Sequence, residues 1–244
     1  MVKQARALRT RTLLIKAAAH AFNADGFHGA SLSQICKRAD ISMGALTFHF
    51  SSKAALADAV EEDGWSTTRT VVQRINTQTA SPLQSLTDLV TALSHLLESD
   101  PLVRCAVRLS RERARTNWTY LWLPAATRLT LEAHRSGHLN STIHPDDVTT
   151  LITLLLNGTQ HLHATANSNT TALFQRSWNL ALNGITPPDV PCPHVPRETR
   201  RVTPAARVTT GPEPRPGRQR SPCRTGDCQL NEVTGVAGEP DAGR

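Results

Sequence analysis

The stretch from Ser31 to Phe50 predicts two short helices joined by a tight turn. Ser31 is a suitable N-cap, because its hydroxyl can accept a hydrogen bond from a free backbone N–H of the first helical turn. Apolar residues follow at helical spacing, namely Leu32, Ile35 and Ala39. The run is interrupted at residues 40–42, where Asp tolerates turn geometry, and Ser42 can cap a second helix that starts at Met43. This is the layout of a helix-turn-helix, whose second helix enters the major groove of DNA.

Positive charge is concentrated in the same part of the chain. Residues 1–56 contain eight Lys or Arg and two Asp, a net charge of +6, whereas the complete chain carries +7. Two amphipathic helices with a turn also occur in many all-helical proteins, so geometry alone leaves DNA binding and ordinary core packing open. The charge favours DNA, because cations that neutralise phosphates release counterions and supply much of the affinity for a duplex.

The candidate DNA contacts lie on the side of these helices that would face a duplex. Gly44 lacks bulk and lets the backbone approach the groove, while Thr47 and His49 can bond a phosphate or a base edge. The alternative for His49 is a surface or capping histidine. Leu46 and Phe50 are expected to face the core instead. The candidates are Ser31, Ser33, Ser42, Met43, Gly44, Ala45, Thr47, Phe48, His49 and Lys53.

Lys53 stands in the first turn of the next predicted helix, which runs from residue 53 to about residue 75. Backbone N–H groups at a helix N-terminus attract anions, so a phosphate there would be held by the helix end and the ammonium together. We therefore expect Lys53 to contact the DNA backbone.

This segment resembles the DNA-binding signature of TetR-family transcriptional regulators. The resemblance covers about fifty residues and is carried by Gly26-Phe27, Ser31-Leu32, Ile35, Ala39, Ile41-Ser42, Gly44-Ala45-Leu46, Phe48-His49-Phe50, Ser52-Lys53 and Leu56. Within that family the chain is similar to the γ-butyrolactone autoregulator receptors of streptomycetes, through residues 48–57 and a run from Val103 to Leu109. The resemblance implies a homodimeric repressor that binds a palindromic double-stranded DNA operator. It also implies release by a small-molecule effector, such as a γ-butyrolactone-like signal that controls secondary metabolism.

Three positions depart from the family pattern. Met43 stands where a Lys or a small polar residue is usual, Thr47 replaces the Tyr of a Leu-Tyr-x-His-Phe run, and Asp40 replaces the turn Gly. Met43 removes a possible phosphate cation and Thr47 removes an aromatic side chain that contacts the DNA backbone in the family. These departures concern the operator sequence and the affinity, not the fold.

The resemblance also implies a ligand pocket in the C-terminal part of the chain. The γ-butyrolactone receptors carry a Trp at the corresponding mid-chain position, and here Trp122 and the residues after it resemble that helix. The candidate ligand contacts are Trp122, Leu86, Val107 and Thr127. The alternative is ordinary core packing of Trp122, because Trp is usually buried. Trp118, one helical turn earlier, is a second candidate.

Helical periodicity continues beyond the basic segment, and no long segment alternates with a period of two. Helices are expected at residues 6–24, 53–75, from Pro82, from Pro101, at about 117–135, from Pro145 and at 169–183. Pro124 should kink the helix that contains it or place its start near Trp122. The sequence predicts an all-α fold of about nine helices. A helix-turn-helix domain would occupy residues 1–52, and a helical ligand-binding and dimerisation domain residues 53–186.

Residues 187–244 differ in composition from the rest. They hold eleven of the fifteen Pro, six of the thirteen Gly and no aromatic residue, so they cannot bury enough apolar surface to offset the entropy of ordering. We expect a disordered tail. The five Cys, an odd number without zinc-site spacing, favour a reducing cytoplasm. No apolar run is long enough for a membrane span or a signal peptide, so no membrane association is expected.

No catalytic, metal or cofactor site is expected. His134 and His138 are four residues apart and His161 and His163 are two apart, but neither pair has an evident third ligand. The chain contains no Gly-rich phosphate loop, no nucleophile elbow and no Cys-x-x-Cys pair. These patterns predict that the protein is not an enzyme.

The last two helices predict a homodimer interface. Leu151, Leu155 and Leu162 form a stripe that, together with Phe174 and Trp178, is wider than one small domain needs for its own core. Two alternatives to a ligand-responsive repressor stay open. One is a pseudo-receptor of the same fold that does not respond to γ-butyrolactones, and the other is a helical interaction protein that has lost DNA affinity.

Overall fold

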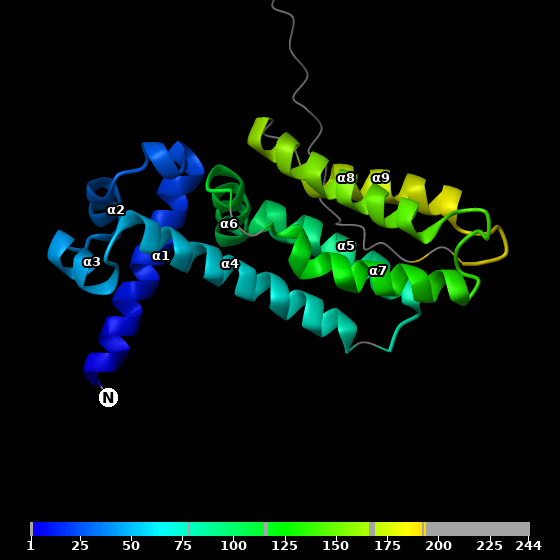
Figure 1. Cartoon of the computed structure of the whole chain (residues 1–244), viewed down its shortest axis with the longest axis horizontal. Helices are drawn as coiled ribbons and strands as arrows, with labels where there is room; N and C mark the ends of the chain where they lie inside the picture. Colours follow the sequence, from blue (N-terminus) through cyan, green and yellow to red (C-terminus); the bar gives the residue numbers. More distant parts are fainter. Residues whose placement is uncertain (1, 78, 115–116, 166–168, 192, 194–244) are drawn as a thin grey trace, which may run out of the picture. The chain divides into compact units, whose positions relative to one another are not determined.

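The computed structural model describes residues 2–77, 79–114, 117–165, 169–191 and 193. Within these residues the chain forms nine α-helices and no strand (Figure 1), which confirms the predicted all-α class. The helices are α1 (Val2–Gly29), α2 (Leu32–Ala39), α3 (Met43–His49), α4 (Lys53–Asn76), α5 (Pro82–Ser99), α6 (Pro101–Glu112), α7 (Thr119–Arg135), α8 (Pro145–Thr165) and α9 (Thr170–Ile185).

The N-terminal hydrophobic cluster joins α1, α2 and α3 to the first half of α4. Leu14, Phe22, Ile35, Leu46 and Leu56 are completely buried in it. Helix α1 is longer than the predicted 6–24 and contains a non-helical residue, Gly26, with a φ of 73°. The helical spacing of apolar residues predicts an inner stripe on α1 made of Leu13, Leu14, Ala17, Ala18, Ala21 and Phe22. The prediction for Leu13 was wrong, because Leu13 is 43% exposed, while Ile15 and Ala19, outside that stripe, are buried.

Helices α4 and α6 cross in close contact, and both supply residues to the N-terminal cluster. A Cβ added to Gly64 would lie 2.7 Å from the Cβ of Ala106 and 2.9 Å from the carbonyl oxygen of Leu102. Only a residue without a side chain allows the two helices to approach this closely. Cys105 and Leu109 of α6 are buried in the N-terminal cluster beside the first turns of α4.

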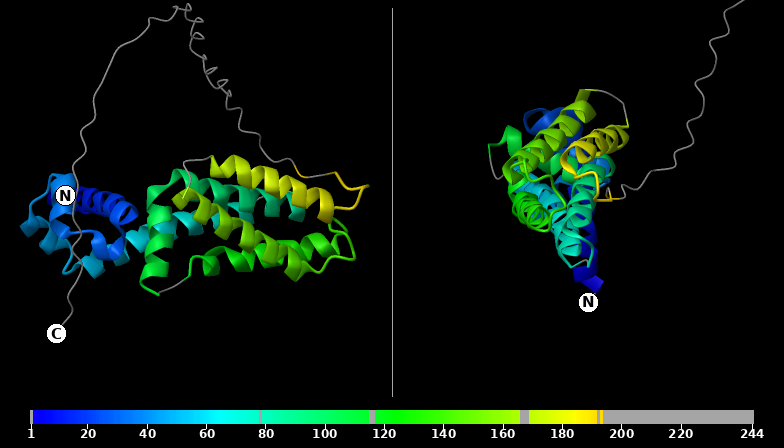
Figure 2. Two further views of the ribbon diagram at one scale, coloured as in Figure 1. Left: turned by 90° about the horizontal axis from the view of Figure 1, so that it is seen from above. Right: turned by 90° about the vertical axis from the view of Figure 1, so that its right-hand side faces the viewer.

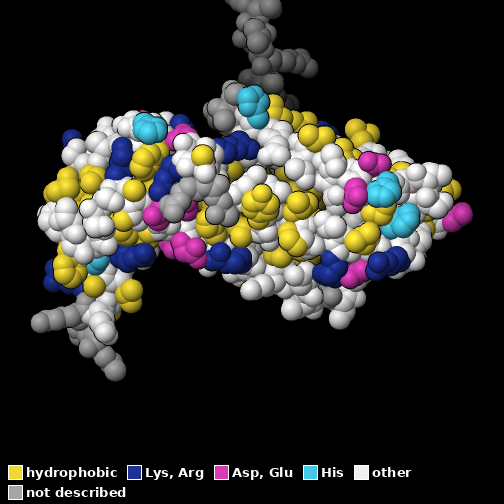
Figure 3. All heavy atoms as spheres, viewed as in Figure 1, with side chains coloured by type: hydrophobic (Ala, Val, Ile, Leu, Met, Phe, Trp, Pro, Cys, Tyr) yellow, Lys and Arg dark blue, Asp and Glu magenta, His cyan; other side chains and the backbone are white. Residues whose placement is uncertain are grey.

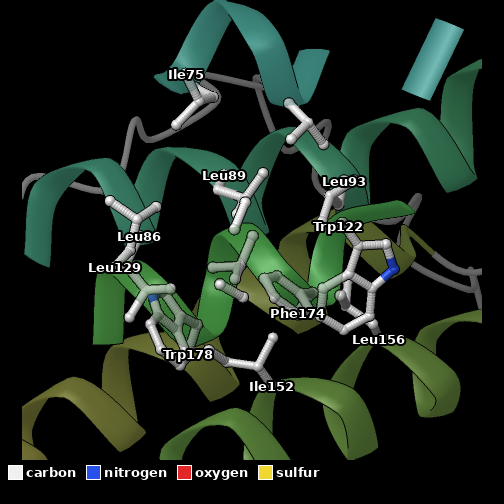
Figure 4. Packing of buried hydrophobic residues seen from close by; sticks show 14 of the residues in the cluster. Ile75, Leu86, Leu89, Leu93, Trp122, Leu129, Ile152, Leu156, Phe174 and Trp178 are labelled. Carbon is white, nitrogen blue, oxygen red and sulfur yellow. The ribbon is translucent and has the colours of Figure 1, made fainter. Parts of the chain in front are cut away.

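The second half of α4 continues into a larger cluster with α5, α6, α7, α8 and α9. Trp122 and Phe174 pack there with Leu93 and Leu156, and Trp178 packs beside Ile152 (Figure 4). Phe174 is 2% exposed and Trp178 is fully buried. They therefore fill the core of their own chain, and the expectation that they add to an intermolecular surface was wrong.

Helix α7 begins at Thr119 and continues through Pro124 to Arg135. The alternative start near Trp122 was therefore wrong. The helix ends before Gly137, whose φ of 71° suits a residue without Cβ. Helices α8 and α9 lie side by side in both views of Figure 2, as their mutual contacts require.

The predicted domain boundary between residues 52 and 53 falls at the start of α4. Helices α4 and α6 reach into both clusters, and the nine described helices group as one compact unit, so the boundary stays a prediction. Residues 187–191 and 193 follow α9 without helical structure. The rest of the predicted disordered tail lies outside the described residues. None of the helices in the described part is long and apolar enough to cross a membrane.

Candidate DNA interface and effector site

The helix-turn-helix is held by side-chain caps at both of its helices. The backbone N–H of Gln34 donates to Ser31 Oγ at 3.2 Å, and the N–H of Ser31 donates to Gln34 Oε1 at 3.1 Å, which forms a capping box. Asp40 takes the left-handed conformation at the turn, with a φ of 54°. Ser42 accepts from the N–H of Ala45 at 3.2 Å and so caps α3.

Helix α3 turns one face to the core and the other to solvent. Leu46 is fully buried and Phe50 is 5% exposed, which confirms their predicted inward orientation. Phe48 is 82% exposed. Of the candidate DNA contacts, Ser33, Ser42, Met43, Gly44, Thr47 and Phe48 are exposed, and Ser31, Ala45, His49 and Lys53 are half-buried. The structure therefore brings these residues together at the α2–α3 end of the molecule.

The outer face of α3 is compact and apolar. A Cβ at Gly44 would meet nothing within 4 Å, so the fold does not require glycine there. The hydroxyl of Thr47 donates to the carbonyl of Gly44 at 3.0 Å, so this hydroxyl is used within α3. The rings of Phe48 and His49 meet edge to face, with centroids 5.3 Å apart. Methyl and aromatic groups of this kind can contact a thymine methyl.

Lys53 forms hydrogen bonds within the fold. Its ammonium donates to the carbonyl oxygens of His28 at 3.3 Å and of Ala30 at 3.0 Å. It also lies 4.9 Å from the centroid of the Phe27 ring. Two of its three N–H groups are thus used to close the end of α1, which the sequence pattern did not indicate. A phosphate contact by Lys53 stays a prediction.

Arg113 also lies over the Phe27 ring, with its guanidinium carbon 5.1 Å from the ring centroid. It pairs with Asp58 at 2.6 Å and with Glu61 at 3.0 Å, and its side chain is 11% exposed. These contacts connect the end of α6 to α4 and to the end of α1. The sequence analysis did not predict these contacts. Arg113 is more than fifty residues away from Asp58 and Glu61 in the sequence, so no local pattern indicates the pairing.

The four candidate ligand contacts do not meet in one cavity. Trp122 is 1% exposed and Leu86 is fully buried, both within the large cluster. Val107 lines two cavities beside α6, one next to α1 and one next to α8. Thr127 lines a groove of about 450 Å³ on α7. The expected grouping of these residues around a single ligand is therefore not present in this conformation.

Trp122 nevertheless has an unusual hydrogen-bonding state. Its ring meets that of Trp118 edge to face at 5.8 Å. Trp118 donates its indole N–H to Thr68 Oγ1 at 3.0 Å, whereas the buried indole N–H of Trp122 has no partner among the described residues. Figure 4 shows this nitrogen at the edge of the cluster. A buried donor without a hydrogen-bond partner lowers the stability of the fold by about 1–3 kcal/mol. A bound molecule with a hydrogen-bond acceptor at this position would remove that cost.

Comparisons with known proteins agree with this geometry. Residues 14–60 match the family described as "Bacterial regulatory proteins, tetR family". The A-factor receptor protein of Streptomyces griseus is 34% identical over 148 residues, which cover 59% of this chain and 51% of that protein. The chain thus spans about half the length of this relative.

Solved structures of two regulators resemble the whole helical part. The TetR family protein CprB from Streptomyces coelicolor, in complex with its biological operator sequence, has a TM-score of 0.66 and 26% identity over 75% of this chain and 92% of that one. A γ-butyrolactone receptor described as ArpA-like has a TM-score of 0.64 and 28% identity, over 75% and 90% of the two chains. Residues 14–60 thus form a TetR-family N-terminal domain.

The structure now gives the surroundings of two residues that depart from the TetR-family pattern, Met43 and Thr47. Met43 is 42% exposed, and its sulfur lies 4.0 Å from the thiol of Cys36 on α2. Thr47 uses its hydroxyl within α3, as described above. The face that this TetR-type helix presents is therefore less polar than the family pattern predicts.

The possible metal ligands of the described part of the chain lie scattered rather than grouped. Among the described residues no three His, Cys, Asp or Glu side chains are grouped so that they could hold a metal ion. His134 and His138 each keep one buried ring nitrogen without a hydrogen-bond partner. The relatives named above are regulators, and none of these arrangements points to a catalytic site.

Proposed function

We propose that this TetR-family protein is a homodimeric transcriptional repressor that binds a palindromic operator. The observation that carries the proposal is the exposed face of α3, which is held outward by Leu46 and Phe50 and lies in the segment with a net charge of +6. Cations supply affinity to any duplex, and the side chains of α3 select the sequence.

Binding of the full chain to DNA from the promoter next to its own coding region tests this proposal. Fluorescence anisotropy would compare that duplex with a shuffled one. Phe48→Ala should weaken binding to the operator by about tenfold and leave the shuffled duplex unaffected, because a lost base contact costs about 1–3 kcal/mol. Tyr120→Ala is the matched control, since Tyr120 is 70% exposed on α7. Equal binding of both duplexes by the unchanged protein would favour an interaction protein without operator recognition.

We propose that the dimer forms through α8 and α9. Leu154 and Leu180 are 63% and 74% exposed, and Leu162 of α8 is 36% exposed. Exposed large apolar side chains that gather on two adjacent helices are typical of an interface. Sedimentation should show a dimer, and Leu154→Glu with Leu180→Glu should convert it to a monomer, whereas Tyr120→Glu should not. A monomer at micromolar concentration would contradict the proposal.

We propose that a γ-butyrolactone-like effector releases the DNA by accepting a hydrogen bond from Trp122. The unpaired indole N–H supports this, because a lactone carbonyl is the acceptor that the buried donor lacks. Ligand and DNA would then favour different conformations and compete by linkage. Trp122→Phe keeps most of the ring and removes the N–H. It should retain operator binding and lose release by a γ-butyrolactone. Release that persists would place the effector elsewhere, and an unchanged protein that no γ-butyrolactone releases would be a pseudo-receptor.

A further inference from the structure

The larger of the two cavities that Val107 lines lies where α1 meets α6. It is a groove of about 740 Å³, with Asn23 of α1 on one wall and Gln160 of α8 on another. Arg104, Arg108 and Arg111, on one side of α6, reach into it together with Glu112. Figure 3 shows Lys and Arg side chains with a few Asp and Glu around this part of the visible face.

The arginines of this groove are held mostly by neutral groups. Arg104 donates to the carbonyls of Leu97 and Glu98 at the end of α5. Arg111 donates to the amide oxygens of Asn157, at 3.1 Å, and Gln160. These bonds orient both guanidinium groups. The carboxylates of Asp100 and Glu98 also interact electrostatically with Arg104, whereas the hydrogen bonds of Arg111 go to neutral amide groups of the described residues. Oriented guanidinium groups of this kind suit a carboxylate or a phosphate.

Arg108 is the exception in the groove, because it has both kinds of partner. It donates to Glu112 Oε1 at 2.6 Å and to the carbonyl oxygen of Asn23 at 2.6 Å. The second oxygen of Glu112 accepts from the backbone N–H of Phe27 at 2.6 Å. An anion that binds Arg108 would therefore compete with Glu112 at the junction between α1 and α6.

The cationic groove also has an apolar lining, formed by Ala24, Leu97 and Val107. A smaller cavity of about 180 Å³ shares Val107, Arg111 and Gln160 with the groove, and most of its lining residues are polar. A ligand that uses both the arginines and the apolar lining of the groove has an anionic head and a short apolar chain.

We propose that this groove binds a small amphipathic anion, with a carboxylate or phosphate head on Arg108 and Arg111 and an alkyl chain toward Val107. The groove does not include Trp122. Its proposed ligand is an anion and therefore differs from a neutral lactone. Because the head competes with Glu112, binding weakens the contact of α6 with α1. An effect on operator binding would follow and rests on the function proposed above, whereas the binding itself does not.

Isothermal titration of the full chain with sodium octanoate tests the site, with octanamide as the neutral probe of the same chain length. Octanoate should bind, and octanamide should bind at least about tenfold more weakly, since it lacks the charge that the arginines pair with. Octyl phosphate and inorganic phosphate, as further probes, show whether the phosphate head and the alkyl chain each contribute. Equal affinities for octanoate and octanamide would overturn the proposal.

Two variants and one control locate the binding. Arg111→Gln should lower the octanoate affinity about tenfold, while Arg135→Gln, which removes the same charge at an exposed position of α7, should not. Gln160→Glu supplies an internal carboxylate to Arg111 and should lower the affinity as well, which keeps the test decisive if one variant folds poorly. Octanoate affinity that is unchanged in both groove variants, or equally reduced in Arg135→Gln, would overturn the site.

Operator binding supplies a separate measurement. Octanoate should lower the affinity of the unchanged protein for its operator, and this effect should vanish in Arg111→Gln. Octanoate that binds without changing operator affinity would overturn the link through Glu112 and leave the site intact. Absence of operator binding before any octanoate is added would instead count against the proposed function.

Discussion

Lys53 and Arg113 both contact the Phe27 ring, at 4.9 and 5.1 Å from its centroid. Lys53 also bonds carbonyls at the C-terminal end of α1, where the helix carries partial negative charge. The sequence predicted only a phosphate contact for Lys53. Its internal partners are backbone carbonyl groups, which every residue has, so no residue type in the sequence indicates them. Its internal bonds are visible only when α1 and α4 are placed together.

Replacement of Lys53 by Met should destabilise the protein by about 1–3 kcal/mol, because hydrogen bonds from a charged donor are lost and two carbonyls lose a partner. Urea unfolding of the full chain measures this change. Lys37→Met, at an exposed position of α2, is the matched control and should leave stability unchanged. Unchanged stability of Lys53→Met would show that the internal bonds contribute nothing.

Glu112 should make the junction between α1 and α6 sensitive to acid. Burial disfavours its charged form, but the hydrogen bonds from the Phe27 N–H and from Arg108 outweigh that effect, so the pKa of Glu112 is lowered from its ordinary 4.5. A lowered pKa in the folded state means that the stabilisation is complete above about pH 4.5 and is lost as the pH falls below it.

Unfolding free energies of the unchanged protein and of Glu112→Gln at several pH values check this dependence. The variant should be less stable at about pH 7, and the difference should shrink as the pH falls below about 4.5. A difference that does not vary with pH would show that the charge of Glu112 is not responsible.

At the scale of elements, the helix starts were the most predictable feature. Ser31, Ser42, Ser81 and Asp100 cap four helices as local chemistry suggests, since each cap needs only residues within one turn. The crossing of α4 and α6 was not predictable, because nothing local distinguishes Gly64 from a helix-weakening glycine. Its importance depends on Ala106 and Leu102, far away in sequence.

Gly64→Val should separate α4 from α6 and lower stability by about 1–3 kcal/mol or more, as expected for overpacking against backbone. Gly29→Ala is the comparison, because its Cβ would only touch that of Asp25 at 3.4 Å. Thermal unfolding by circular dichroism measures both. A Gly64→Val protein as stable as Gly29→Ala would contradict the close crossing.

At the scale of the whole molecule, the DNA-facing part was more predictable than the effector part. The helix-turn-helix is built from twenty consecutive residues whose caps and periodicity are local. The residues around Trp122 come from α5, α7, α8 and α9. No local sequence pattern therefore shows that Leu86 is buried in the core whereas Thr127 lines a surface groove. Leu13 and Phe174 were misplaced for the same reason, because burial depends on which neighbour covers a helix.

The central claim is that two copies of α3 read one operator together. Selection of duplexes from a random pool by the full chain, followed by footprinting of the selected sequence, tests it most directly. The account predicts a palindrome whose half-sites are about 34–36 Å apart and are protected together. Selection of sequences without symmetry, or protection that does not depend on sequence, would contradict it.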